Sequence, residues 1–165
     1  MSGTDSEKPE ITGGLLTMIK QADLKLISAL RKNARESLTT ISRNSRIPIS
    51  TLFDRLKQQE GSIIMKHTTL LDFAKLGYNC RANLLLSVER EQRDKLISYL
   101  KAHPAINNLF KINNGFDLMA EVIFNNVKEL EEFYEEVEKT FKINEKKTFY
   151  VIDDLKREEF LGIKK

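Results

Sequence analysis

The sequence predicts an α+β protein: an N-terminal winged helix-turn-helix followed by a C-terminal ferredoxin-like βαββαβ αβ-sandwich. Up to about residue 62, apolar residues recur at helical spacing in three short segments. From residue 79 onward, segments that alternate apolar and polar residues are interleaved with longer helical segments. The basic residues are concentrated in the first of these regions, so we expect two domains with different roles.

The first helix is expected over residues 23–33, where Leu26, Ile27 and Leu30 share one face. Residues 1–14 are polar and end in two glycines, and a short apolar cluster follows over residues 15–19. We therefore expect residues 1–18 to be a flexible N-terminal tail.

The most informative stretch is residues 37–62, which reads as two short helices separated by the polar corner 44–46. Ser37 is suited to cap the first helix, and Pro48 is suited to start the second, where its missing N–H costs nothing. Two short helices joined by such a turn form a helix-turn-helix, whose second helix can enter a DNA major groove. Two ordinary core helices would show the same spacing.

The second helix carries hydrogen-bonding side chains on the face away from its apolar residues, which suits base edges and phosphates. Arg55 has an alternative role in a salt bridge inside the domain, to Glu36 or Asp54, and Thr51 has an alternative role in packing. The predicted DNA-binding residues are Arg43, Arg46, Ser50, Thr51, Asp54, Arg55, Lys57, Gln58 and Lys66.

Residues 63–65 and 68–71 read as two short strands on either side of Lys66 and His67. Three helices followed by such a hairpin make a winged helix-turn-helix, with Lys66 or His67 at the tip of the wing. We therefore expect a DNA-binding domain over residues 19–71, followed by a linker over residues 72–78.

The C-terminal region predicts a sheet with two helices. Strands are expected over residues 79–89, 106–112, 118–124 and 146–152, and helices over residues 91–102 and 127–140. This order is the split βαβ unit, so residues 79–153 are expected to form a ferredoxin-like domain, with a charged tail over residues 154–165. Its open sheet face carries Leu85, Met119, Ile123, Phe149 and Val151 by alternation, and we expect two such faces to pack together as a dimer.

Composition excludes several classes of protein. No run of 18 apolar residues is present, and the N-terminus lacks the layout of a signal peptide, so we expect a cytoplasmic protein without a membrane contact. A lone Cys80 excludes an internal disulfide, and two histidines with one cysteine do not make a recognisable zinc site. We therefore expect no metal and no cofactor.

The charge is unevenly distributed along the chain. Residues 20–66 hold ten Lys and Arg against four Asp and Glu, whereas residues 67–165 hold sixteen against seventeen. A basic region joined to a nearly neutral one fits a nucleic-acid-binding module attached to a second domain. Random asymmetry on a solvated surface is the alternative.

Over residues 19–152 the chain resembles the Lrp/AsnC (feast/famine) transcription regulators. Residues 23–27 and 33–35 are similar to that family's opening "D-L-x-I-L … N-A-R", and residues 50–57 to its recognition helix. Residues 71–78 match the connector "L-D-x-x-x-L-G-Y", and residues 116–118 match the aromatic-Asp-Leu after the central turn. The resemblance implies a DNA-binding homo-oligomer, at least a dimer, that reads palindromic sites in double-stranded DNA. It leaves open whether dimers stack into tetramers or octamers.

The resemblance also implies an amino-acid effector at the turn between the second and third strands of the sheet. Asp117 would pair with the ammonium group, and the backbone of residues 113–115 would bind the carboxylate. A purely structural hairpin is the alternative role of Phe116 and Asp117. Two departures stand out: Arg46 replaces the usual glycine of the helix-turn-helix corner, and Asn114 replaces a glycine of the turn. Asn tolerates the left-handed conformation, so the turn can survive, and the crowded site should favour a small effector. The predicted effector-binding residues are Asn113, Asn114, Gly115, Phe116 and Asp117.

Two alternatives come from other classes of function. The sirohaem decarboxylases are similar in both domains, and Ala82-Asn83 after Gly77-Tyr78 resembles them faintly. They would need His, Arg and Tyr clustered around a tetrapyrrole, whereas His67 and His103 stand apart, so we expect no enzyme activity. An interaction module without DNA binding is the other alternative, and the basic recognition face argues against it.

Overall fold

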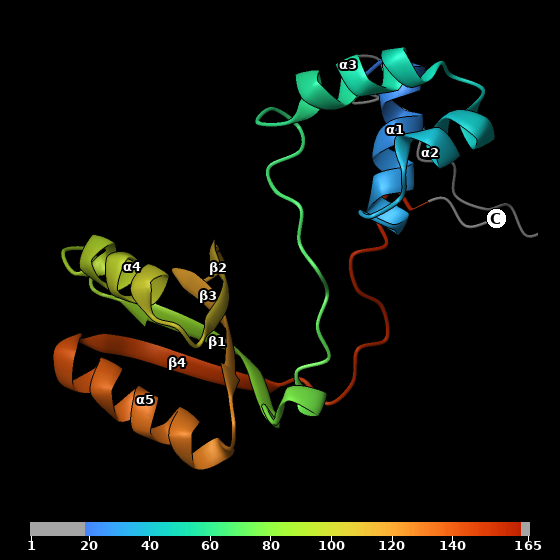
Figure 1. Ribbon diagram of the computed structural model, residues 1–165. Helices are drawn as coiled ribbons and strands as arrows, with labels where there is room; N and C mark the ends of the chain where they lie inside the picture. The colour runs from blue at the N-terminus through green and yellow to red at the C-terminus, as the bar shows by residue number, and fades with distance from the viewer. Residues whose placement is uncertain (1–18, 163–165) are drawn as a thin grey trace, which may run out of the picture. The chain divides into compact units, whose positions relative to one another are not determined.

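The computed structural model describes residues 19–162, which form two compact units (Figure 1). Among the described residues, the helical unit comprises residues 19–69 together with residues 156–162, and the sheet unit comprises residues 70–155. The helical unit contains α1 (Gln21–Lys32), α2 (Leu38–Ser45) and α3 (Ile49–Gln59). The tail expected over residues 1–18 lies outside the described residues.

One buried residue from each helix forms the core of the helical unit. Leu26 of α1, Ile41 of α2 and Leu52 of α3 are almost fully buried, and partly buried residues such as Leu30 and Leu56 pack around them. The Ser37 side chain accepts a hydrogen bond from the Thr40 N–H at 3.1 Å, so its predicted role as the cap of α2 is confirmed.

The predicted wing is wrong in its secondary structure. Residues 63–65 and 68–71 do not pair as strands; a single bridge joins Glu60 to Ile64 around the turn at Gly61, and residues 65–72 have no regular structure. Apolar and β-branched residues favour a strand, but a strand also needs a partner for its backbone groups. Met65, an apolar residue of this segment, is 92% exposed and packs against little of the described chain, so burial does not hold the segment in a strand.

The sheet unit begins with the short 3₁₀ helix η1 (Ala74–Leu76). The remaining elements are β1 (Cys80–Val88), α4 (Arg93–Ala102), β2 (Ile106–Lys111), β3 (Leu118–Phe124), α5 (Val127–Thr140) and β4 (Ile143–Tyr150). The sheet is entirely antiparallel with the order β2-β3-β1-β4, which is the predicted split βαβ topology.

The two helices cover one face of this sheet. Alternate residues of β1 and β3, such as Leu84, Leu86 and Ala120, are buried against Leu96 of α4 and Leu130 of α5. Their neighbours in sequence lie on the other face, because successive side chains of a strand point to opposite sides. The alternation therefore predicts correctly which residues of β1 enter the core.

The open face of the sheet is partly apolar. The strand register brings Leu85 opposite Met119 and Asn83 opposite Phe149, so the five residues expected on this face do share it. Phe149 is 55% exposed, and Phe110 of β2, which is paired with Met119, is 48% exposed. In the described part of the chain nothing covers these side chains.

The chain returns to the helical unit after β4. Lys156 and the residues up to Gly162 belong to the helical unit, although they are separated from it in sequence by the whole sheet unit. Across residues 19–162, none of the helices has the length and apolar character needed to cross a membrane.

Candidate nucleic-acid interface and ligand site

The outer face of α3 carries a continuous set of exposed side chains. With about 100° between successive residues of a helix, residues 50, 53, 54, 57 and 58 fall on the side opposite Leu52 and Leu56. None of their side chains makes a hydrogen bond or an ion pair with a residue that the structure describes. The exposed residues of this face are Ser50, Phe53, Asp54, Lys57 and Gln58.

Phe53 is the member of this face that the sequence reasoning missed. It is 57% exposed, although an aromatic residue in a short helix is usually part of the core. The signal was available in the spacing, since Phe53 lies four residues before Lys57 and three after Ser50, and so on the polar side of the helix. An exposed aromatic ring beside hydrogen-bonding groups can contact a thymine methyl group.

Arg55 lies at the flank of this face and is paired inside the helical unit. Its Nη1 donates to Oδ2 of Asp23 at 3.2 Å, and the Asp23 side chain is only 5% exposed. The intradomain ion pair was the alternative raised for Arg55, but the partner is Asp23 of α1 rather than Glu36 or Asp54. The second carboxylate oxygen of Asp23 is buried without a hydrogen-bond partner among the described residues, so this carboxylate depends on Arg55.

The corner between α2 and α3 is made at Arg46. This residue follows α2 in the left-handed conformation, with φ of 59° and ψ of 33°, which is the conformation that glycine normally supplies. The Ser42 hydroxyl donates to the Ile47 carbonyl at 2.6 Å and closes the corner. Arg43 and Arg46 are both exposed beside it.

Two further predicted residues lie outside the exposed face of α3. Thr51 is half-buried at the flank of the helix, which fits its alternative role in packing. Lys66 is exposed in the irregular segment that replaces the wing, next to His67, whose Nε2 lies 3.4 Å from Glu60 Oε1.

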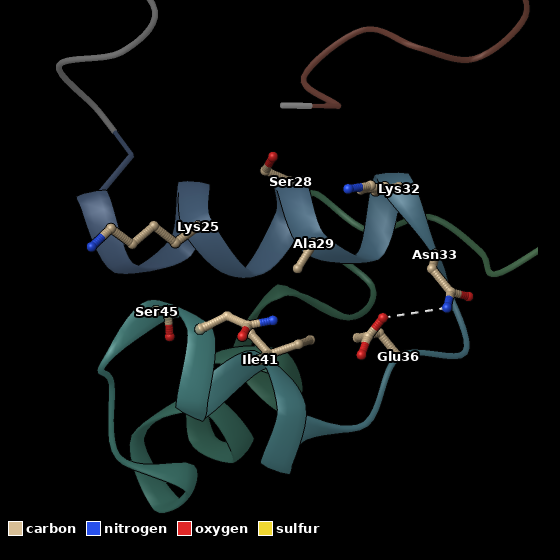
Figure 2. A pocket seen from close by; sticks show the side chains of 9 residues that line it. Lys25, Ser28, Ala29, Lys32, Asn33, Glu36, Ile41 and Ser45 are labelled. Carbon is tan, nitrogen blue, oxygen red and sulfur yellow. Dashed lines mark hydrogen bonds between the residues drawn. The ribbon is translucent and has the colours of Figure 1, made fainter. Parts of the chain in front are cut away.

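A pocket of about 550 Å³ lies between α1 and α2 (Figure 2). Lys25, Ala29 and Ile41 line it, and Asn33 and Glu36, which are hydrogen-bonded to each other at 3.4 Å, lie at one end. None of the predicted DNA-binding residues lines this pocket, so it is separate from the outer face of α3.

In the sheet unit, the turn expected to bind an effector is formed as the sequence predicts. Asn114 adopts the left-handed conformation with φ of 66°, and Gly115 follows with φ of 91°. The prediction that Asn114 can take the conformation of the usual glycine is therefore confirmed. Phe116 is half-buried after the turn, and the Lys147 Nζ lies 5.0 Å from the centre of its ring.

Asp117 is engaged differently from the prediction. Its Oδ2 accepts a hydrogen bond from the Val88 N–H at 2.9 Å, and its Oδ1 is paired with the Arg93 guanidinium of α4. Both oxygens therefore have donors within the protein. The carboxylate joins the turn to β1 and α4, whereas the prediction had it pair with the ammonium group of an effector. Asn113, Asn114 and Gly115 are exposed, and their backbone is the part of the predicted site that remains open.

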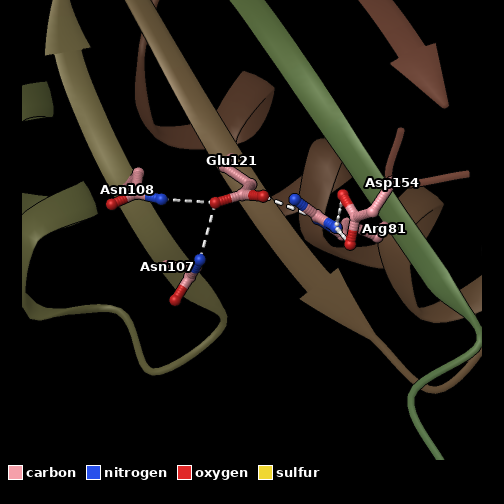
Figure 3. A network of polar contacts seen from close by, with 5 residues as sticks. All are labelled: Arg81, Asn107, Asn108, Glu121 and Asp154. Atoms are coloured by element: carbon pink, nitrogen blue, oxygen red, sulfur yellow. Dashed lines mark hydrogen bonds and ion pairs between the residues drawn. The ribbon is translucent and has the colours of Figure 1, made fainter. Parts of the chain in front are cut away.

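A polar network interrupts the open face of the sheet (Figure 3). Glu121 of β3 is 6% exposed and accepts hydrogen bonds from Arg81 Nε and Asn107 Nδ2, each at 2.6 Å, and from the Asn108 amide. Arg81 also donates to both oxygens of Asp154 at 2.7 Å. Burial works to raise the pKa of Glu121, but the hydrogen bonds from Asn107, Arg81 and Asn108 outweigh it, so the pKa of the carboxyl is lowered.

The sequence alone does not predict this network. Glu121 is the one acidic residue in an otherwise apolar strand, which was the available signal. Its partners come from β1 and β2, and Asp154, which binds Arg81, lies in the segment after β4; these neighbours can be assigned only once the register is known. Among residues 19–162, no three His, Cys, Asp or Glu side chains gather in an arrangement that could hold a metal ion.

Residues 81–160 match the family described as the Lrp/AsnC ligand binding domain. The curated relatives include the HTH-type transcriptional regulator FL11 of Pyrococcus furiosus, which is 27% identical over 121 residues, covering 73% of this chain and 80% of the relative. They also include the HTH-type transcriptional regulator LrpC of Bacillus subtilis, which is 25% identical over 116 residues, covering 70% of this chain and 81% of LrpC.

Solved structures share the fold over both units. The structure of B. subtilis LrpC has a TM-score of 0.76 at 21% identity, covering 84% of this chain and 97% of LrpC. A transcriptional regulator of Neisseria meningitidis, solved as a complex with L-Met, has a TM-score of 0.77 at 17% identity, covering 84% of this chain and 93% of the other. The resemblance inferred from the motifs is therefore confirmed.

Proposed function

We propose, since residues 81–160 of this chain form an Lrp/AsnC ligand binding domain, that the protein is a DNA-binding transcription regulator of the Lrp/AsnC type. The relatives FL11 and LrpC are named as HTH-type transcriptional regulators, which favours this function over that of a sirohaem decarboxylase. The proposal has three parts, concerning DNA, the dimer and the effector, and each depends on a different surface.

The outer face of α3 is the observation that carries the DNA-binding part. Ser50, Asp54 and Gln58 supply donors and acceptors for base edges, Lys57 supplies a charge for a phosphate or a guanine, and Phe53 supplies an apolar contact. None of these side chains makes a hydrogen bond or an ion pair with another described residue, and Phe53 is 57% exposed, so the whole face is accessible to a duplex. Arg43 and Arg46 extend the basic surface toward the DNA backbone.

Arg55 has a different place in this proposal from the one expected. Because its guanidinium neutralises the buried carboxylate of Asp23, its main role is to fix α3 against α1. Loss of Arg55 would therefore weaken DNA binding through the orientation of the recognition helix rather than through a lost base contact.

The dimer part rests on the open sheet face. Phe110 and Phe149 are about half exposed on it, and Leu85, Met119 and Ile123 lie between them by register. A flat, partly apolar face of this kind favours a second copy as its cover, since two sheets pack face to face at about 10 Å. A dimer would place two recognition helices on a twofold axis, so the DNA site should be a palindrome.

The effector part is restricted to the backbone of the turn. The N–H groups of residues 113–115 are suited to a carboxylate, and Asn113 and Asn114 can add side-chain amides. Asp117 holds the turn in place through Val88 and Arg93, so the ammonium group of an amino acid would need a carbonyl or a group from a second copy. A small amino acid or its amide is the chemical class that fits.

A footprint on genomic DNA selected by the protein tests the main proposal. We expect protection of two half-sites separated by one or more helical turns of about 10–10.5 base pairs. Lys57→Ala should weaken operator binding and lower the slope of affinity against salt by about one, because one phosphate charge is lost. Lys101→Ala, which removes an exposed lysine of α4 in the sheet unit, is the matched control and should leave both quantities unchanged. Protection without dyad symmetry, or equal affinity for random DNA, would contradict the proposal.

Sedimentation at micromolar concentration tests the dimer separately. Phe149→Asp places a charge on the open face and should shift the protein toward the monomer, since an unpaired charge resists burial. Tyr150→Asp, at the neighbouring position of β4 whose side chain points the other way, controls for damage to the strand. A monomeric wild-type protein would refute the dimer without touching the assignment of α3.

A further inference from the structure

The end of the described chain is bound to the helical unit by one arginine. Arg31, in the last turn of α1, donates from Nη1 to Glu158 Oε2 and from Nη2 to the Glu158 carbonyl, both at 2.8 Å. Its Nε donates to the Phe160 carbonyl at 3.1 Å. All three nitrogens of the guanidinium are therefore used by a segment more than 120 residues away in sequence.

The tail adopts an uncommon backbone conformation to meet this guanidinium. Glu158 and Leu161 have φ of 51° and 63°, in the left-handed region that residues other than glycine avoid. Such conformations persist when the surrounding contacts hold them in place. Here those contacts include the three bonds to Arg31 and a backbone bond from the Gly162 N–H to the Glu159 carbonyl at 3.1 Å.

The segment before the tail is held at its other end by a second arginine. Arg81 of β1 donates to both oxygens of Asp154, which belongs to the sheet unit, and the Val151 N–H donates to the Arg81 carbonyl. The chain is thus fixed on the sheet unit up to Asp154 and fixed again on the helical unit from Glu158 onward. Residues 155–157 connect these two attachments.

We propose that residues 156–162 are a latch, closed by Arg31, that ties the helical unit to the sheet unit by a second chain segment. The chain passes between the units twice, once between residues 69 and 70 and again between residues 155 and 156. With the latch closed, both crossings are anchored, and the helical unit has a narrower range of positions than one tether would allow. With the latch open, only the first crossing remains.

The consequence for DNA rests on the proposed function. A dimer that reads two half-sites binds the second half-site as an intramolecular step, whose strength depends on the effective concentration of the second helical unit. A closed latch restricts the positions of the second helical unit, and so raises its effective concentration at the half-site for one particular spacing between the two half-sites. Opening it should weaken binding to a full operator while leaving binding to a single half-site unchanged.

Limited digestion with trypsin tests whether Arg31 closes the latch. Lys156 and Arg157 are cleavage sites within it, and cleavage requires the segment to open. Arg31→Gln should speed cleavage at these two sites by about tenfold, because one ion pair and two hydrogen bonds to a charged group are lost. Lys32→Gln removes the same charge from the same helical turn, has no bond to the tail, and should leave the rate unchanged.

Small-angle X-ray scattering on the full-length protein tests the tether itself. Arg31→Gln and a chain ending at Leu155 should both give a larger radius of gyration than wild type, and Lys32→Gln should not. Unchanged scattering for the first two, or equal cleavage in Arg31→Gln and Lys32→Gln, would overturn the latch. If wild type binds no operator, the proposed function fails, whereas digestion and scattering still decide the latch.

Discussion

Replacement of Arg46 by glycine should stabilise the helical unit and weaken DNA binding at the same time. Arg46 carries the left-handed turn between α2 and α3 with φ of 59°. This conformation costs a residue with a Cβ about 1–2 kcal/mol of free energy, whereas it costs glycine almost nothing. Glycine also gains entropy in the unfolded chain, which offsets about 0.5–1 kcal/mol of the difference. The net gain in the free energy of unfolding should be about 0.5–1 kcal/mol, or a few degrees in Tm.

The same substitution removes a cation beside α3, the helix proposed to read DNA. If Arg46 contacts a phosphate, Arg46→Gly should weaken operator and random DNA alike and reduce the salt slope by about one. Calorimetry would follow the stability, and fluorescence anisotropy with labelled duplex over a series of salt concentrations would follow the binding.

Two variants separate the backbone effect from the charge effect. Arg46→Ala removes the charge but keeps the Cβ, so it should match Arg46→Gly in DNA binding without the gain in stability. Arg43→Gly removes a charge from the helical interior of α2, where glycine costs about 0.5–1 kcal/mol, so its effect on stability should have the opposite sign. Destabilisation by Arg46→Gly would refute the reasoning, because the left-handed conformation would then not be a cost to the arginine.

Substitutions at three other positions, Arg55, Glu121 and Asn114, test contacts inside the two units. Arg55→Ala should lower the free energy of unfolding of the helical unit by about 1–3 kcal/mol in chemical denaturation, since it strands the buried Asp23, and a double change with Asp23→Ala should recover part of the loss. Because the pKa of Glu121 is lowered by folding, its contribution to stability is present above its ordinary value of about 4.3 and is lost as the pH falls through the folded value. Glu121→Gln should therefore flatten the loss of stability on acidification below about pH 5, and an unchanged acid profile would contradict this. Asn114→Gly should be nearly neutral in thermal unfolding while Asn114→Ala should cost about 1 kcal/mol, and equal Tm values for these two variants would argue against a left-handed turn.

The sequence was most informative where a local rule decides the structure. Within residues 19–162, the order and type of the five α-helices and four strands follow from spacing, and strand alternation identifies the core residues of β1. Ser37 and Asn114 were predictable for the same reason, since a cap and a left-handed turn each depend on one residue and its immediate neighbours.

The sequence was less informative where contacts join distant elements. Sequence reasoning favours Glu36 or Asp54 as the partner of Arg55, because both are nearer to it in sequence than Asp23. The true partner, Asp23, lies on α1, and residue spacing within the helices does not predict how α1 packs against α3. The prediction of a two-stranded wing is wrong because strand propensity alone does not provide a second strand to pair with. Asp117 was assigned to a ligand because its donors, Val88 and Arg93, come from other elements of the sheet unit.

The helical unit is built from two segments that are far apart in the sequence, and this affects the order in which its contacts form during synthesis. The core residues of α1, α2 and α3 leave the ribosome together, so this part can fold while the rest is still being made. At about 5–20 residues per second, Glu158 emerges roughly ten seconds or so after Arg31. The tail can reach α1 only when β4 has been synthesised, and the bond between Arg31 and Glu158 is therefore among the last to form. A nascent chain that stops before Glu158 would contain α3 but would lack the bond between Arg31 and Glu158.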